Sequence, residues 1–222
     1  MLDLFTSFIS YLTTLPLLEL VAMLLALAYV LLAAQGSLWC WPAAFISTAL
    51  YTVIFYDVLL LMDSALNAYY LLMAIYGYWA WQKNTTTNSI HNEKEKSIPL
   101  AIVSWSTHKH VYACIALTVI ALALGYIVAN YTPAAFPYLD TFTTVFAIFA
   151  TYLVTQKVLE NWLYWMVIDA ISIYLYIEKG LIPTTILFVI YVIIAIYGYV
   201  KWHAIYAQSK IKNINVSDVI SS

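Results

Sequence analysis

Long apolar stretches separated by short polar breaks dominate the chain. The stretches approach or exceed the roughly 18 residues that a bilayer-spanning helix needs, and few charges interrupt them. Seven spans are predicted, at residues 17–35, 39–56, 60–81, 111–130, 138–156, 160–178 and 181–203. Residues 1–15 are mixed in character, which favours a helix lying at the membrane interface. The polar residues 83–110 and 206–222 predict a solvated loop and a loose tail.

The chain contains an internal duplication. With a constant offset of 121 residues and no gap, 17 of the 71 positions from residue 11 to residue 81 are identical to their counterparts. The paired residues include Trp41 with Trp162, Gly77 with Gly198, Gln35 with Gln156, Tyr70 with Tyr191 and Trp81 with Trp202. Identity along so long a gapless register indicates two copies of one structural unit.

Each copy of the unit contains three spans, and one linker span joins the copies. The first repeat covers residues 16–82, the linker helix residues 111–131, and the second repeat residues 132–205. One linker span returns the chain to its starting side, so both repeats point the same way across the membrane. The predicted fold class is an all-α polytopic membrane protein with seven transmembrane helices in a 3+1+3 arrangement of parallel repeats.

The distribution of lysines predicts the orientation. All nine basic residues are lysines. Eight of them fall on one side of the predicted spans and only Lys179 falls on the other. Because lysine-rich loops stay in the cytoplasm, residues 83–110 and the C-terminus are expected inside and the N-terminus outside.

Composition excludes several classes of protein. The chain is 64% hydrophobic and 9% charged, with a mean hydropathy of +0.86, which is typical of a membrane protein and not of a soluble domain. The four histidines lie at or beyond the ends of spans, so no intramembrane pair is available for haem or zinc. Cys40 and Cys114 lack metal-site spacing, and no phosphate-binding loop is present. We therefore expect no enzymatic activity, no cofactor and no nucleic-acid partner.

Two polar residues fall in mid-membrane. Asp169 lies near the bilayer centre on the sixth span, where leaving it in lipid would cost about 2.5 to 3.5 kcal/mol, so it should face a cavity or a partner. Asn67 lies at a similar depth on the third span. A purely structural role, such as a hydrogen bond between helices, remains an alternative for both residues and is stronger for Asn67.

Amides beside indoles and tyrosines suit a flat aromatic ligand with polar edges. The candidate binding residues are Gln35, Trp39, Asn67, Tyr70, Thr151, Gln156, Asn161, Trp162, Trp165, Asp169 and Tyr191. Interfacial belting accounts for most of the tryptophans and tyrosines in such a chain, and simple packing is an equal alternative for Tyr70 and Tyr191. No arginine occurs, and no lysine lies in the body of a span, so the interior offers nothing to neutralise an anion. A neutral or cationic substrate is expected.

Three segments carry a family resemblance: WCWP from Trp39, LNAYYLLMAIYGYWAW from Leu66, and VLENWLYWMVIDAISIYLYIEKGLIPTTILFVIYVIIAIYGYVKW from Val158. Over about residues 17–203 the chain resembles the PnuC family of bacterial vitamin B3 transporters. The string TYLVTQKVLENWLYW, followed by Asp169 and the YGYVKW ending, is the most specific part. One departure is that the Trp41–Pro42 pair lacks a glycine expected shortly after it in relatives, which affects only the local bend of that helix.

The resemblance implies a SWEET-like fold in the bacterial inner membrane, a homotrimer, and one nicotinamide riboside site per protomer. It also implies facilitated diffusion, with uptake drawn forward by cytosolic phosphorylation of the riboside. The cationic pyridinium ring of this ligand suits an aromatic face. Two other hypotheses stay open: a sugar carrier or proton-coupled vitamin transporter, and a membrane scaffold that transports nothing.

Overall fold

The computed structural model describes residues 16–57, 61–89 and 101–220, and all the helices in these ranges are α-helices. They are α2 (Leu17–Ala34), α3 (Cys40–Asp57), α4 (Leu61–Ser89), α5 (Thr107–Tyr131), α6 (Pro137–Thr155), α7 (Asn161–Glu178) and α8 (Ile182–Ile220). Each predicted span overlaps one of these helices. The interfacial helix expected at residues 1–15 lies outside the described residues.

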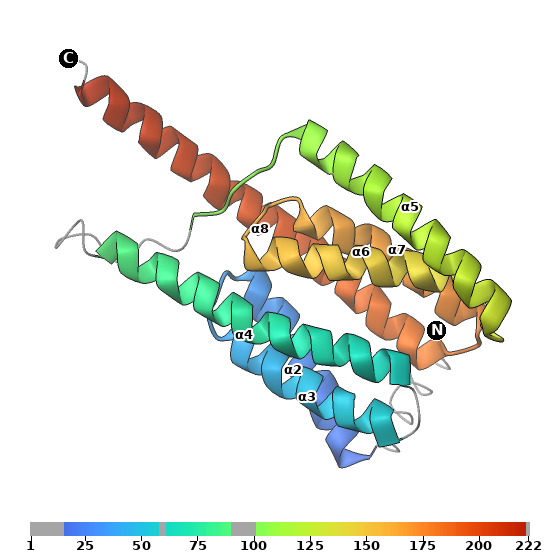
Figure 1. Ribbon diagram of the computed structural model, residues 1–222. Coiled ribbons are helices and arrows are strands. Elements are labelled where there is room, and N and C mark those ends of the chain that lie inside the picture. The colour runs from blue at the N-terminus through green and yellow to red at the C-terminus, as the bar shows by residue number, and fades with distance from the viewer. Residues whose placement is uncertain (1–15, 58–60, 90–100, 221–222) are drawn as a thin grey trace.

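Four of the described helices are long and apolar enough to cross a membrane on their own composition: α2, α5, α6 and the Thr184–Ile211 part of α8. The other three, α3, α4 and α7, pack within the same bundle (Figure 1). Their sequences are rich in tryptophan, tyrosine, serine and threonine, which lowers their hydropathy. Helices that bury such groups inside a bundle need fewer aliphatic side chains than helices that face lipid.

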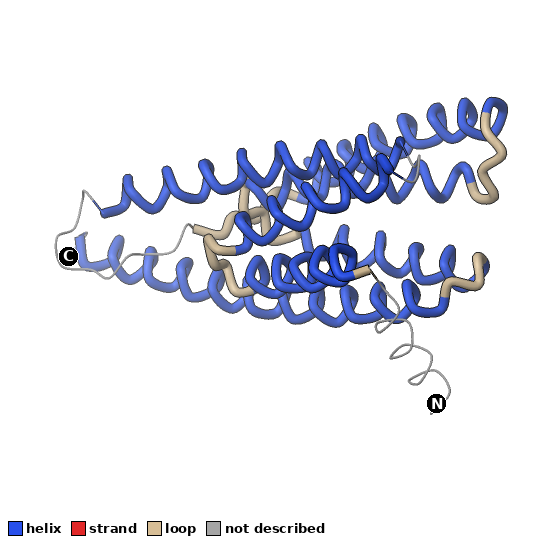
Figure 2. The backbone as a smooth tube through the Cα atoms, turned by 90° about the horizontal axis from the view of Figure 1, so that it is seen from below, coloured by secondary structure: helices blue, strands red, loops and turns tan. Residues whose placement is uncertain are grey.

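Two helices extend well beyond their predicted ends. Sequence hydropathy ends the third span at residue 81 and the last at residue 203, whereas α4 continues to Ser89 and α8 to Ile220. Both extensions run past the loops at one end of the bundle (Figure 2). The prediction of a loose tail after the last span was wrong as far as Ile220, because a helix anchored in a bundle propagates at little cost. Polar residues outside the bilayer do not stop it.

The turns between paired helices follow one backbone pattern. Gly36 has φ +70° and Lys157 has φ +50°, and each is the left-handed residue that ends the first helix of its repeat. In each turn the backbone N–H of this residue bonds back into the last helical turn: Gly36 N–H to Ala33 O at 2.9 Å, and Lys157 N–H to Val154 O at 3.0 Å. These bonds satisfy carbonyls that a helix end otherwise leaves open.

Helix contacts repeat in the same order in the two halves of the chain. The first half pairs α2 with α3 and α3 with α4, and the second half pairs α6 with α7 and α7 with α8. The halves meet where α2 contacts α8 and α4 contacts α6. Helix α5 lies at the edge of the bundle against α6 (Figure 1). Gly125 of α5 allows this approach, since a Cβ there would collide with the Tyr138 ring.

Candidate functional site

Four tryptophans form a layer across the interior near the α2–α3 and α6–α7 loops. This tryptophan quartet consists of Trp41, Trp81, Trp162 and Trp202, each at most 2% exposed. Trp41 and Trp81 meet edge to face at 5.2 Å between ring centroids, and Trp162 and Trp202 do the same at 5.4 Å. The two pairs touch through Trp81 and Trp202, whose centroids are 6.3 Å apart. The layer is thus built from the duplicated positions of both repeats.

Two glycines and two cross-repeat hydrogen bonds hold the quartet. Gly77 packs directly on the Trp41 ring, and a Cβ on Gly198 would lie 2.7 Å from Cε2 of Trp162. Trp81 Nε1 donates to the Thr155 carbonyl at 3.1 Å, and Trp202 Nε1 donates to the Ala33 carbonyl at 3.2 Å. The third helix of each repeat is therefore bonded to the end of the first helix of the other. The quartet joins the two halves of the protein.

Three buried polar atoms beside the quartet have no hydrogen-bond partner among the described residues. They are Nε1 of Trp41, Nε1 of Trp162 and Oδ1 of Asn161. Asn161 is fully buried at the start of α7, and its Nδ2 donates to the Val158 carbonyl at 2.6 Å. An unpaired buried donor or acceptor costs about 1 to 3 kcal/mol. Two donors and one acceptor near one aromatic layer can bond a ligand with polar edges.

Asp169 lies two helical turns further along α7 and is 4% exposed. Tyr70 of α4 and Tyr191 of α8 lie near enough to interact electrostatically with its carboxylate. Neither of the two ion pairs formed by described residues involves Asp169. A buried carboxylate with one tyrosine from each repeat in its vicinity can attract a cation or accept hydrogen bonds from hydroxyl groups.

The other predicted residues fall into two groups. Asn67 is half-buried on α4, Thr151 is buried and bonds the Ala147 carbonyl of its own helix at 2.8 Å, and Trp165 lies between the quartet and the cluster around Phe146. Gln156 donates to the Tyr76 hydroxyl at 2.9 Å. The remaining two lie apart from the buried group, because Gln35 is exposed and Trp39 is 74% exposed.

Lys157 corrects the expectation that the interior holds no basic group. It lies in the α6–α7 loop, yet it is only 4% exposed, and its Nζ lies 3.9 Å from the centroid of the Trp81 ring. Its left-handed backbone costs a residue other than glycine roughly 1 kcal/mol. The prediction failed because loop position in the sequence does not show the direction in which a long side chain folds.

The loop that carries Lys157 is fixed from outside by the segment before α5. Val103 pairs with it in a short parallel bridge: Val103 N donates to Lys157 O at 3.1 Å and Leu159 N donates to Val103 O at 2.8 Å. Glu160 accepts from the Ser104 hydroxyl at 2.5 Å and from the Trp105 backbone N–H at 3.2 Å. The loop is therefore held in one position relative to the bundle.

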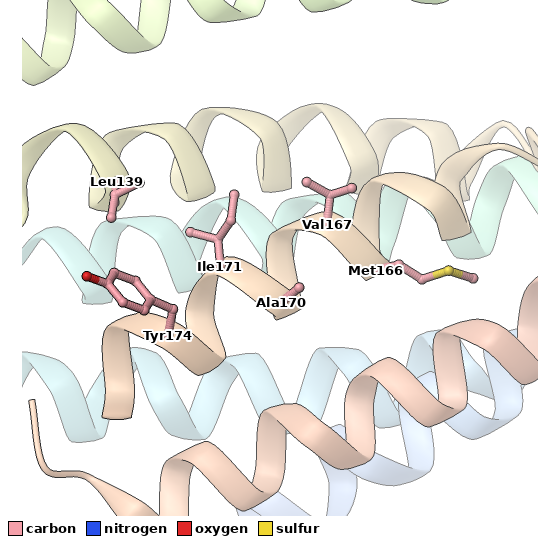
Figure 3. A pocket seen from close by; sticks show the side chains of 6 residues that line it. All are labelled: Leu139, Met166, Val167, Ala170, Ile171 and Tyr174. Carbon is pink, nitrogen blue, oxygen red and sulfur yellow. The ribbon is translucent and has the colours of Figure 1, made fainter. Parts of the chain in front are cut away.

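An apolar groove lies apart from this interior site. It has a volume of about 510 Å³ and lies between α6 and α7 (Figure 3). Its lining residues are Leu139, Met166, Val167, Ala170, Ile171 and Tyr174. Val167 and Tyr174 are more than half exposed, so the groove opens on the outer face of the bundle. Among the described residues no three metal-ligating side chains gather, so the described part offers no metal site.

Sequence reasoning missed part of the interior group, namely Trp41, Trp81, Trp202 and Lys157. The signal for the tryptophans was present, since Trp41 matches Trp162 and Trp81 matches Trp202 in the duplicated register. The competing interpretation was that these tryptophans belong to the aromatic belt at the membrane–water interface, and identical spacing in the two repeats does not exclude it. For Lys157 the sequence carries no comparable signal.

The fold defines a multi-pass helical membrane protein whose interior carries buried polar and aromatic side chains. Comparison with known proteins gives the family. Residues 16–204 match the family described as nicotinamide mononucleotide transporter. The chain belongs to this family, and its resemblance to the PnuC transporters is confirmed. It is a membrane transport protein.

Individual relatives of the chain are described as vitamin transporters. It is 28% identical over 174 residues to the nicotinamide riboside transporter PnuC of Escherichia coli K12, covering 71% of this chain and 72% of the relative. It is 24% identical over 185 residues to the riboflavin/roseoflavin transporter RibM of Streptomyces davaonensis, covering 83% of each. The crystal structure of the vitamin B3 transporter PnuC superposes with a TM-score of 0.71 at 21% identity, covering 93% of this chain and 90% of that one. This last likeness concerns the fold.

Proposed function

We propose that the protein takes up nicotinamide riboside by facilitated diffusion and that phosphorylation in the cytosol traps the product. The observation that carries the proposal is Asp169, which is buried, interacts electrostatically with Tyr70 and Tyr191, and has no basic partner in the described ion pairs. A pyridinium cation supplies the missing positive charge, and a ribose supplies hydroxyl donors. Membership of the family and the named relatives support the same substrate class.

The ligand would lie between Asp169 and the tryptophan quartet. In this position the carboxamide meets the free Oδ1 of Asn161 and the indole N–H groups of Trp41 and Trp162. Aromatic faces hold the ring, since a desolvated cation–π contact is worth about 2 kcal/mol. Thr151, Gln156, Trp165 and Asn67 complete the wall. A site built on such bonds rejects analogues that lack the polar groups.

The same proposal includes the arrangement of the chain. The repeated order of helix contacts supports two parallel three-helix repeats joined by α5, as in SWEET-like transporters. The lysine distribution supports a cytoplasmic C-terminus and an external N-terminus in the bacterial inner membrane. The lateral groove on α6 and α7 is a surface available for contacts between protomers of a homotrimer.

Transport into liposomes tests the coupling. Purified protein should equilibrate labelled riboside without an imposed pH gradient, and accumulation should require an enclosed riboside kinase and ATP. Concentrative uptake driven by a proton gradient alone, and lost in Asp169→Asn while binding survives, would establish the proton-coupled alternative instead. Preference for sugars would establish a sugar carrier, and absence of binding to every candidate would leave the scaffold hypothesis.

A further inference from the structure

Lys157 carries a charge at a position where the matching residue of the first repeat carries none. Its counterpart in the first repeat is Gly36, which makes the same left-handed turn with open space around it. Glycine adopts this backbone without strain, whereas a lysine does not. The second repeat nevertheless carries a lysine, and its side chain turns inward to Trp81 instead of outward to water. A strained residue with a buried charge at a transport site points to a role in function.

The ammonium group of Lys157 has an aromatic partner and, among the residues that the structure describes, no acidic one in an ion pair. Its Nζ lies 3.9 Å from the Trp81 ring centroid, and neither ion pair of the described residues includes it. The titratable group that acts on it is the Cys40 thiol. Burial lowers the pKa of Lys157 to about 8, with a smaller opposing contribution from Cys40. The charge is held in the interior mainly by a ring face.

The position of the Lys157 ammonium group can affect how a cationic substrate passes through the protein. Trp81 is one member of the quartet, and it links the two tryptophan pairs through its contact with Trp202. The quartet lies across the interior at the end of the bundle where the α6–α7 loop lies. The loop is fixed by Val103 and Glu160, so Lys157 is presented to Trp81 by a held backbone. A cationic ligand that leaves the interior at this end meets a Trp81 ring whose face is already occupied by the Lys157 ammonium group.

We propose that Lys157 is a tethered cation that competes with the cationic substrate for the Trp81 face and so sets both affinity and cation selectivity. This inference rests on the proposed riboside transport. A pyridinium ring and an ammonium group use the same ring quadrupole, and their like charges repel in a site of low dielectric. The riboside displaces Lys157 when it passes, and Lys157 returns to the ring afterwards. A neutral nucleoside carries no charge for the Lys157 ammonium group to repel, so Lys157 opposes its binding less.

Equilibrium binding to the detergent-purified full chain tests the proposal. The probes are nicotinamide riboside, which is cationic, and its 1,4-dihydro form, which is neutral and keeps the carboxamide and ribose. Lys157→Met removes the charge and keeps most of the chain length. We expect it to tighten binding of the riboside about tenfold and to change binding of the dihydro form less than about twofold. Lys157→Gly, which suits the left-handed backbone, should do the same and covers the case in which the methionine variant folds poorly.

Two matched variants isolate the charge at this position. Lys157→Arg keeps a cation and should keep the wild-type ratio of the two affinities. Lys201→Met removes a lysine whose Nζ lies 5.6 Å from the Tyr197 ring, near the same end of the bundle, and should also leave the ratio unchanged. A wild-type ratio in both Lys157→Met and Lys157→Gly, with riboside binding intact, would overturn the role of Lys157 and leave the proposed function standing.

Two further outcomes are informative. If neither the wild type nor any variant binds the riboside, the proposed function itself fails. If nicotinamide mononucleotide binds the wild type but not Lys157→Met, while riboside binding is unchanged, then Lys157 holds a phosphate and does not compete with a cation. That result would overturn the inference and would assign the site to the nucleotide.

Discussion

The two repeats share their packing and differ in their chemistry. Both place a tryptophan against a glycine, Trp41 on Gly77 and Trp162 on Gly198, and both send a third-helix indole N–H to the opposite repeat. At the interior positions the polar groups lie mostly in the second repeat. Four of the differing pairs are Val30 with Thr151, Gly36 with Lys157, Cys40 with Asn161 and Thr48 with Asp169.

This difference separates two constraints on a duplicated membrane protein. Close helix crossings depend on shape, so the bulky ring and the facing glycine must be kept together in each copy. A ligand that lacks two-fold symmetry needs its polar partners only once. One repeat can therefore supply the charge and the amide while the other supplies apolar surface. The predictions below test this division, beginning with the packing.

The largest effect is expected at the paired glycines. Gly198→Ala would place a Cβ 2.7 Å from the Trp162 ring, and Gly77→Ala would meet the Trp41 ring still more closely. Because both rings are buried in the quartet, we expect each variant to lose about 1 to 3 kcal/mol of stability. Thermal unfolding in detergent measures the loss. The double variant Gly198→Ala with Trp162→Phe should recover part of it, and unchanged stability of both single variants would contradict the shared-packing interpretation.

The helices and the duplication could be predicted from the sequence because hydropathy and register are properties of the chain itself. The ends of α4 and α8 could not, since the residues that follow are polar whether or not they stay helical. The burial of Asp169 could be predicted because a carboxylate in an apolar span is conspicuous. The quartet could not, because an indole in a core and an indole at the membrane surface look alike in sequence.

The next largest effect is expected at the carboxylate of the second repeat. Asp169→Asn removes the charge that interacts electrostatically with Tyr70 and Tyr191, and riboside binding should weaken by about 10- to 100-fold, as for hydrogen bonds to charged groups. The neutral dihydro riboside should lose less. The paired residue Thr48 bonds its own helix, to Ala44 O at 2.8 Å, so Thr48→Val should change binding little. Equal losses in these two variants would remove the asymmetry between the repeats.

A smaller loss of riboside binding is expected at Asn161, which lies closer to the quartet than Asp169. Asn161→Ala removes an amide whose Oδ1 has no partner among the described residues, and it should weaken riboside binding by about 1 to 3 kcal/mol. Cys40→Ala, at the paired position, should leave binding nearly unchanged. Isothermal titration calorimetry measures the riboside affinity of both variants. Because Asn161 also bonds the Val158 carbonyl, unfolding temperatures must be measured alongside, and similar damage from Cys40→Ala would contradict the prediction.

The smallest effect is expected from pH. Burial lowers the pKa of Lys157 to about 8, so the group is charged below that pH and loses its proton as the pH rises through it. The riboside keeps its quaternary charge throughout. If the ammonium competes for Trp81, riboside binding should tighten by about two- to fivefold as the pH rises across this range.

Lys157→Gly gives the second repeat the residue of the first and should abolish this part of the pH dependence. Cys40, which interacts with Lys157, and Asp169, deeper on α7, remain in that variant, so their titration is common to both proteins. An identical pH profile in wild type and Lys157→Gly would show that the proton on Lys157 does not act on the substrate.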